Sequence, residues 1–406
     1  MRQTAPESLS SVELERRFPY PGPALLSLWP RVKYEFGRNS KRADNLRVED
    51  PMKTLRYALG ALLITCLLFT NAYASSFTGI VVLGDSLSDN GNLYAAIHYP
   101  PSPYYGGRFS NGPVAVEYLS QRLGLSLADY AWGGATTGVG NVNDGGTVDA
   151  LGPAGLPGIK TVFQSVFPAT PIDPDALYIV WGGPNDFWFV TTPAEAAVAI
   201  GKAVTNLVTM AGALRALGAK NVLVANMPDL GKTPAALAGG AQASFFFTQI
   251  SLGFNQALKE NLPPGVHYFD TYSVLTNIIR NPNRYGFTNI TDPLINAPPG
   301  ADPAQYLFFD NVHPTTAGHQ ILADAFYQSV APTVIIGECN SGAPNPLFSS
   351  GSTVWDLIEQ VATNARNHGQ FVSGVDSITN ELKKSEIYSG SQKAAIQSCA
   401  AKADIP

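Results

Sequence analysis

Short apolar runs alternate with longer, partly polar stretches over most of the chain, and this alternation predicts strands and helices in turn. Five of the runs are continuous and rich in Val, Ile and Tyr, which is typical of strands buried on both faces of a parallel sheet. The predicted strands are residues 78–83, 128–132, 176–181, 221–226 and 266–270. Alternation of such strands with helices predicts a doubly wound α/β sandwich.

The predicted helices have recognisable start and stop residues. Those between the strands cover residues 113–123, 193–217, 235–261 and 271–280. Pro113 and Pro193 are expected in the first turn of their helices, and Gly218 is expected at a C-terminal cap. Residues 281–309 are rich in Pro and Gly and are expected to form a loop. Three further helical patterns, at residues 354–367, 372–384 and 392–402, predict a helical C-terminal extension.

The segment at residues 52–74 has the architecture of a secretory signal peptide. A short positive region precedes an apolar run, and Ala72 and Ala74 supply the small residues of a cleavage site. The apolar run is shorter than the ~20 residues of a membrane-spanning helix, so a cleaved signal is preferred to an anchor. Since a signal peptide acts at the start of a chain, we expect translation to begin at Met52. Residues 1–51 would then be a mis-annotated upstream segment, the alternative being a disordered extension, and the protein would be secreted or periplasmic.

Composition and charge narrow the class of protein. Of the 406 residues, 45% are hydrophobic and 14% are charged, which argues against a mainly disordered chain. The formal net charge is −5, so no basic field attracts nucleic acid. We therefore expect one large α/β domain over residues 75–335, followed by the helical extension over residues 336–406.

Two cysteines, Cys339 and Cys399, remain after removal of the signal segment. In an oxidising compartment, two leftover cysteines are expected to pair, and this disulfide would fasten the C-terminal extension. The alternative is two separate buried thiols.

Three short motifs follow predicted strands, and each also has an ordinary structural interpretation. Residues 84–92 read GDSLSDNGN and place Ser86 at a turn after a strand, where a helix cap also uses a serine. Residues 130–138 contain a double glycine, whose backbone N–H groups can approach a ligand closely. Residues 183–186 read GPND, in which Asn185 offers a side-chain amide, although such sequences are common in turns.

The fourth motif, DNVH, places Asp310 three residues before His313. One local turn can bring this carboxylate against the imidazole, fix its tautomer and stabilise the imidazolium that forms when the ring takes a proton. A metal site shared with His319 is disfavoured because the six-residue spacing aligns two ligands poorly. No metal or other cofactor is therefore expected. A serine, backbone and amide donors and an Asp–His pair are together the components of acyl transfer.

The four ordered motifs resemble those of the SGNH or GDSL hydrolases, from about residue 77 to residue 330. The stretch RFSNGP at residues 108–113 also resembles secreted bacterial GDSL lipase-like proteins. The resemblance implies a flavodoxin-like, three-layer α/β/α sandwich with a five-stranded parallel sheet. It also implies the hydrolysis of carboxylic esters.

The resemblance assigns a role to individual residues of the motifs. It makes Ser86 the nucleophile, His313 the general base and Asp310 the residue that orients the base. The oxyanion hole would be formed by the backbone N–H groups of Ser86 and Gly134 and by the side-chain amide of Asn185.

The substrate is less well defined by the sequence. Aromatic residues around the motifs are candidates for an acyl pocket or a sugar platform, or simply for the core: Tyr104, Tyr105, Phe109, Trp132, Trp181, Phe187, Trp188 and Phe189. The resemblance favours lipid esters, including (lyso)phospholipids, with acyltransferase activity and peripheral contact with membranes or micelles as further expectations. The alternatives are a carbohydrate esterase that deacetylates polysaccharide and, outside the enzymes, a secreted binding or adhesion protein.

Overall fold

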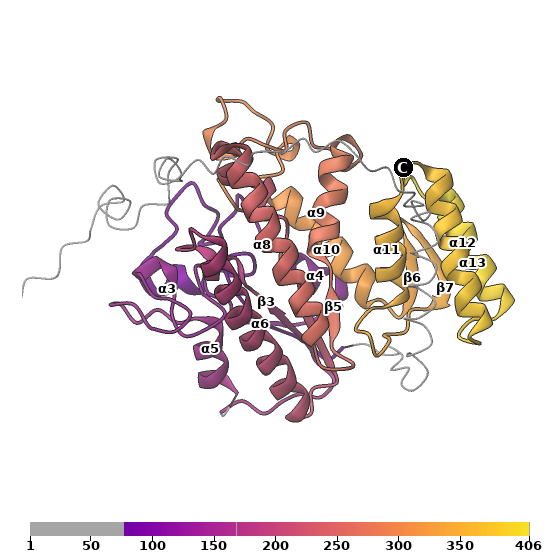
Figure 1. Ribbon diagram of the computed structural model, residues 1–406, viewed down its shortest axis with the longest axis horizontal. Helices are drawn as coiled ribbons and strands as arrows, with labels where there is room; N and C mark the ends of the chain where they lie inside the picture. The colour runs from indigo at the N-terminus through magenta and orange to yellow at the C-terminus, as the bar shows by residue number, and fades with distance from the viewer. Residues whose placement is uncertain (1–76, 168, 406) are drawn as a thin grey trace, which may run out of the picture.

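The computed structural model describes residues 77–167 and 169–405. The expected signal peptide at residues 52–74 and the segment at residues 1–51 lie outside the described residues. The described chain forms an α/β domain with a C-terminal extension, drawn in orange to yellow, beside its α9 and α10 helices (Figure 1).

A five-stranded parallel sheet lies at the centre of the domain. Its strands are β1 (Ile80–Gly84), β2 (Leu127–Asp129), β3 (Leu177–Trp181), β4 (Asn221–Ala225) and β5 (His267–Phe269), in the order β2-β1-β3-β4-β5. All pairings in this sheet are parallel, and each strand corresponds to one that the sequence predicts. The chain reverses its direction of winding between β1 and β3, which is where ligands bind in open α/β sheets. The predicted doubly wound α/β fold is confirmed.

The central strand β3 shows why this sequence forms a sheet that is covered on both faces. All five of its residues are buried. Leu177, Ile179 and Trp181 pack into one apolar cluster, whereas Tyr178 and Val180 pack into another. Because successive side chains of a strand point to opposite faces, a continuous apolar run supplies both layers of the core.

Helices on each face complete the two apolar clusters. One face is covered by α4 (Ala115–Leu123), α9 (Thr271–Arg280) and α10 (Thr316–Val330), and the other by α5 (Ile159–Val166), α6 (Pro193–Ala216) and α8 (Gly240–Asn261). Figure 1 shows α6 and α8 side by side on the same face of the sheet, and they contact each other along their length. Helix α6 is long and apolar enough to cross a membrane by length and composition alone, but its buried residues here pack on the sheet.

Some helix boundaries differ from those predicted. Pro193 begins α6 as expected, and Gly218, at a φ of +107°, follows the capping residue of that helix. Pro113 precedes α4, which begins at Ala115, so its predicted place in the first turn is wrong. The predicted helix at residues 235–261 is two helices, α7 (Pro234–Ala238) and α8. The chain turns at Gly240, the first residue of α8, whose φ of +82° is outside the helical region.

Two helices and one β-hairpin have no counterpart in the prediction. The short helix α3 (Asn92–Ile97) follows the first motif, and α5 lies between the second and third. The antiparallel hairpin of β6 (Thr333–Ile336) and β7 (Cys339–Pro344) opens the C-terminal extension. The expected domain boundary at residues 335/336 falls within β6.

The C-terminal extension is largely helical and has an apolar cluster of its own. Its helices are α11 (Val354–Asn364), α12 (His368–Lys384) and α13 (Gly390–Lys402). A disulfide joins Cys339 of β7 to Cys399 of α13, with 5.4 Å between their Cα atoms. The hairpin and the last helix are therefore held together covalently.

The extension covers the edge strand β5 of the sheet. The backbone N–H of Tyr268 donates to the carbonyl of Gly351 at 2.8 Å, and the Trp355 ring stacks parallel to that of Phe269. His267 and Asp356 are both buried and are hydrogen-bonded at 2.8 Å. An uncovered edge strand exposes unpaired backbone groups, so these contacts make the extension part of the fold.

Candidate active site

Ser86 lies in a tight turn directly after β1, at the carboxyl edge of the sheet. The carboxylate of Asp85 accepts the Leu87 N–H at 3.0 Å, and the Asp85 carbonyl accepts the N–H groups of Ser88 and Asp89. These bonds close the turn on either side of Ser86, which is 8% exposed. The turn therefore holds the Ser86 side chain at the carboxyl edge of the sheet, where ligands bind in open α/β folds.

Two hydrogen bonds join Ser86, His313 and Asp310 in one line. The Nε2 atom of His313 lies 2.8 Å from Ser86 Oγ, and its Nδ1 atom lies 2.7 Å from Asp310 Oδ2. An ionised carboxylate can only accept, so Nδ1 of the neutral ring carries the proton and Nε2 accepts from the serine hydroxyl. The structure thus brings together the three residues that the sequence predicts, from positions 227 residues apart.

The surroundings of Asp310 keep its carboxylate ionised. Burial alone would raise the pKa of this group, but the neighbouring His313 and two backbone N–H groups hold the pKa of Asp310 below its usual value. Those N–H groups belong to Val312 and His313 and lie 2.8 and 2.7 Å from Oδ1. An imidazolium formed on His313 would face a negative charge at hydrogen-bond distance.

Hydrogen bonds fix Gly133 on both sides of its Cα atom. The N–H of Gly133 donates to Asp89 Oδ2 at 2.6 Å, and its carbonyl accepts the side-chain amides of Asn141 and Asn143, each at 2.8 Å. In a trans peptide the carbonyl and the following N–H point in opposite directions. The two asparagines therefore aim the N–H of Gly134 away from themselves.

Only glycine fits at either position of the double glycine. A Cβ atom on Gly133 would lie 2.1 Å from the ring of Phe109, which itself packs against His313. Gly134 has a φ of +76°, and a Cβ there would lie 2.1 Å from the amide nitrogen of Asn143. The double glycine thus allows the close approach of this loop to the aromatic and amide side chains around it.

The GPND motif is joined to the glycine loop by hydrogen bonds. The amide of Asn185 donates to the Ala135 carbonyl at 3.0 Å, which leaves its second N–H for another acceptor. Asp186 accepts the backbone N–H and the hydroxyl of Thr137. Burial raises the pKa of Asp186 to about 7 and that of Asp85 to about 6. The site therefore carries less negative charge at neutral pH than two exposed aspartates would give it.

His319 is not part of this constellation. It is buried on α10, and its Nδ1 atom accepts the Ala115 N–H at 3.2 Å. Burial lowers the pKa of His319 to about 3, so the ring is neutral. Across residues 77–167 and 169–405, no group of three or more His, Cys, Asp or Glu side chains is placed to hold a metal ion.

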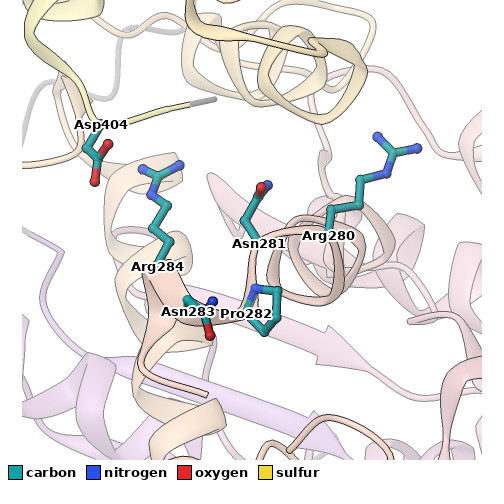
Figure 2. Close-up of a pocket in the computed structure, with 6 residues that line it drawn as sticks. All are labelled: Arg280, Asn281, Pro282, Asn283, Arg284 and Asp404. Carbon is teal, nitrogen blue, oxygen red and sulfur yellow. The ribbon is translucent and has the colours of Figure 1, made fainter. Parts of the chain in front are cut away.

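The aromatic residues around the motifs divide between core and surface. Phe109, Trp181 and Phe187 are buried, whereas Tyr105 and Phe189 are exposed. A separate hollow of about 300 Å³ lies far along the sequence from Ser86, between the end of α9 and the C-terminus. Figure 2 shows its charged lining, with Arg284 pointing toward Asp404, and it contains none of the motif residues.

Sequence reasoning missed the supporting residues Asn141 and Asn143. They lie in an irregular segment beyond the second motif, next to the short 3₁₀ turn Val142–Asp144, where periodicity gives no signal. The role of Asp89 was also missed, although Asp89 lies within the first motif.

A comparison with known families identifies the domain. Residues 80–326, more than half of the chain and all four motifs, match the family model described as GDSL-like Lipase/Acylhydrolase. The chain belongs to this family. Its members are ester-hydrolysing enzymes, and the SGNH/GDSL resemblance of the sequence is confirmed.

Among the relatives of this GDSL hydrolase, an uncharacterised Pseudomonas putida protein from the trpE–trpG intergenic region is 31% identical over 67% of this chain and 52% of its own length. The phosphatidylcholine-sterol acyltransferase of Aeromonas hydrophila is 28% identical over 70% of this chain and 85% of its own. The chain thus spans about half the length of the first relative. An acetyl xylan esterase structure from Geobacillus stearothermophilus is 17% identical, with a TM-score of 0.38, covering 65% of this chain and 99% of that one.

Proposed function

We propose that this protein is a serine esterase that cleaves carboxylic esters of lipids through an acyl-enzyme on Ser86. The observation that carries the proposal is the line of hydrogen bonds from Ser86 Oγ through His313 to Asp310, at 2.8 and 2.7 Å. A hydroxyl, a base and an ionised group that orients the base are the parts of an activated nucleophile.

The first half of the reaction forms the acyl-enzyme. Ser86 Oγ attacks the ester carbonyl carbon while His313 Nε2 takes the hydroxyl proton. The carbonyl oxygen becomes an oxyanion, which the N–H groups of Ser86 and Gly134 and the amide of Asn185 stabilise. The carbon–oxygen bond to the leaving group then breaks, and His313 returns the proton to the departing alcohol. Donors that are fixed beforehand act most strongly on this developing charge.

The second half of the reaction releases the acyl group. Water, or the hydroxyl of another alcohol, gives a proton to His313 Nε2 as its oxygen attacks the acyl carbon. Collapse of the second oxyanion breaks the bond to Ser86 Oγ, which takes the proton back. Throughout, Asp310 remains ionised and stabilises the imidazolium.

Lipid esters are supported by a relative and by the surface near the motifs. The Aeromonas relative, matched over 85% of its length, is named for phosphatidylcholine and a sterol. Phe189 follows the third motif and is 58% exposed. Ile295 is also exposed, and its N–H donates to the Phe309 carbonyl next to the fourth motif. Two apolar side chains beside the third and fourth motifs are therefore exposed and available to an acyl chain.

The proposal extends to the location of the protein. A disulfide between Cys339 and Cys399 supports an oxidising compartment, in keeping with the signal pattern at residues 52–74. N-terminal sequencing of protein recovered outside the cytoplasm tests this, and a mature N-terminus before residue 60 contradicts it.

The decisive experiment combines labelling with a substrate panel. A fluorophosphonate should label the wild type and a Ser165→Ala control, which removes an exposed hydroxyl on α5, but not Ser86→Ala. Phosphatidylcholine, lysophosphatidylcholine and acetylated xylan are then compared as substrates. Turnover confined to xylan replaces the lipid assignment with a carbohydrate esterase, and absence of labelling contradicts the esterase itself.

A further inference from the structure

Tyr104 contacts the acidic member of the proposed triad. Its hydroxyl donates to Asp310 Oδ2 at 2.9 Å, and this is the same oxygen atom that faces His313 Nδ1 at 2.7 Å. Tyr104 lies 206 residues before Asp310, in the segment between the first motif and α4. None of the four motifs contains it.

The tyrosine completes the set of donors around the carboxylate. Oδ1 of Asp310 accepts the N–H groups of Val312 and His313, and Oδ2 accepts Nδ1–H of His313 and the Tyr104 hydroxyl. Each oxygen therefore has two donors, which is close to the capacity of a carboxylate. A hydrogen bond to a buried, charged acceptor is stronger than one between neutral groups.

Aromatic packing holds the tyrosine ring in place. The Tyr104 ring contacts the rings of Phe309 and Phe109 edge-on, at centroid distances of 5.0 and 6.0 Å. The Phe109 ring in turn lies 5.0 Å from the His313 imidazole. The position of the hydroxyl is thus determined by the same side chains that surround the base.

The RFSNGP stretch at residues 108–113 ties this segment to the loop that follows His313. Ser110 Oγ donates to the Pro314 carbonyl at 2.9 Å, and Asn111 Oδ1 accepts the Thr316 N–H at 2.8 Å. Thr316 Oγ1 also donates to the Pro113 carbonyl at 3.0 Å. The segment is therefore joined at several points to the residues that follow His313, and Tyr104 reaches the triad itself.

We propose that Tyr104 is a positioning residue that acts on His313 through Asp310. It fixes the rotamer of the carboxylate and withdraws part of its charge from the imidazole, so that the base is held in line with Ser86 and is not over-stabilised as an imidazolium. The inference rests on the proposed function of Ser86 and His313.

The direction of the effect follows from electrostatics. The other titratable groups that interact with His313 are the Asp85 carboxylate after β1 and the neutral His319 ring on α10, and Tyr104→Phe leaves both in place. Without the tyrosine hydroxyl, the full charge of Asp310 acts on the imidazole, and the imidazolium forms more readily. The acid limb of the pH–rate profile should then move toward higher pH. The carboxylate also gains freedom to rotate, which lowers the fraction of molecules with an aligned base and so lowers kcat.

The test compares two tyrosine-to-phenylalanine variants. Tyr104→Phe keeps the packed ring and removes the hydroxyl. Tyr272→Phe is the matched control, since the Tyr272 hydroxyl also contacts a carboxylate, that of Asp229, at 3.3 Å. The rate of labelling by a fluorophosphonate is measured from pH 5 to 9, which requires no knowledge of the natural substrate.

In Tyr104→Phe, labelling at neutral pH should slow by about tenfold, the effect of one hydrogen bond to a charged group. Its acid limb should shift upward, whereas Tyr272→Phe should match the wild type. The low-field ¹H NMR signal of the proton between His313 and Asp310 should also move in Tyr104→Phe alone. If the two variants have the same labelling rate, the same acid limb and the same NMR signal while the wild type is still labelled, the inference is overturned. Absence of labelling in the wild type instead overturns the proposed function.

Discussion

Asp89 Oδ2 accepts the backbone N–H of Gly133 at 2.6 Å, and this bond joins the first motif to the second. The same side chain accepts the N–H groups of Gly91 and Asn92 through Oδ1. Asp89 is fully buried between them. Together with the Asn92 amide, which donates to the Ala131 carbonyl at 2.9 Å, it keeps the turn that carries Ser86 and the loop that carries Gly134 in their relative position.

Asp89→Asn should reduce activity and stability together. An amide has one accepting oxygen, so its NH₂ group would face a backbone N–H and leave a buried donor unsatisfied, at about 1–3 kcal/mol. With the Gly134 donor displaced, we expect about a 10²-fold loss of kcat/KM with p-nitrophenyl esters. Asp149→Asn is the control, since Asp149 lies in an exposed loop and its exposed ion pair with Lys202 contributes little to stability. An Asp89→Asn enzyme with wild-type kcat/KM and melting temperature would show that the bond does not hold the loop.

Asn185→Ala tests the proposed amide donor of the oxyanion hole. The amide already gives one N–H to the Ala135 carbonyl, so its orientation is set and the second N–H is available to the oxyanion. Loss of one such donor should lower kcat by about 10²–10³-fold. KM should change little, since the donor acts on charge that appears only in the transition state. Steady-state kinetics with a soluble ester measure both constants, and a kcat within threefold of wild type contradicts the role.

The sequence predicts the parts of the site that follow strands. Ser86 and Asn185 come directly after continuous apolar runs, and Asp310 and His313 are close enough in sequence to meet in one turn. The carboxyl ends of parallel strands lie on one edge, so the convergence of these residues follows from the fold class.

The supporting residues cannot be predicted in this way. Asn141, Asn143 and Tyr104 lie in irregular segments, and their partners are set by where those loops return to the sheet edge. Tyr104 contacts a residue 206 positions away, and no local pattern encodes such a pairing. Strand β7 could not be predicted for another reason, because its sequence CNSGAP lacks the β-branched and aromatic residues that TVII in β6 has and that are typical of strands.

Removal of the disulfide should destabilise the extension without changing the chemistry. Cys339 and Cys399 are 60 residues apart, and a loop of this length constrains the unfolded chain by about 4 kcal/mol. The double variant Cys339→Ser/Cys399→Ser should melt at a lower temperature and keep its kcat at 25 °C, since both cysteines pack in the apolar cluster of the extension and none of the motif residues does. Thermal melts with and without dithiothreitol provide the control: the reductant should lower the melting temperature of the wild type and leave that of the variant unchanged. If dithiothreitol leaves the melting temperature of the wild type unchanged, even when it is added while the protein is unfolded, the pairing is contradicted.

Glu359 on α11 should make stability depend on pH. Its carboxylate accepts a hydrogen bond from Asn277 on α9, and burial raises the pKa of Glu359 from 4.5 to about 7. The folded protein therefore binds this proton more tightly than the unfolded chain does. Its contribution to the free energy of unfolding is full below pH 4.5, falls as pH rises, and levels off above pH 7.

Glu359→Gln isolates this contribution from the other carboxyl groups whose pKa values burial also raises, Asp85 and Asp186 among them. The amide oxygen can still accept from Asn277, and it has no proton to lose. The variant should therefore gain stability over the wild type as pH rises, by about 2 kcal/mol at pH 8 after allowance for solvent screening. Glu338→Gln, at an exposed position in the β6–β7 turn, controls for the loss of one negative charge. Urea unfolding at pH 5, 6, 7 and 8 measures the difference, and a difference that stays constant with pH means that Glu359 ionises alike in both states.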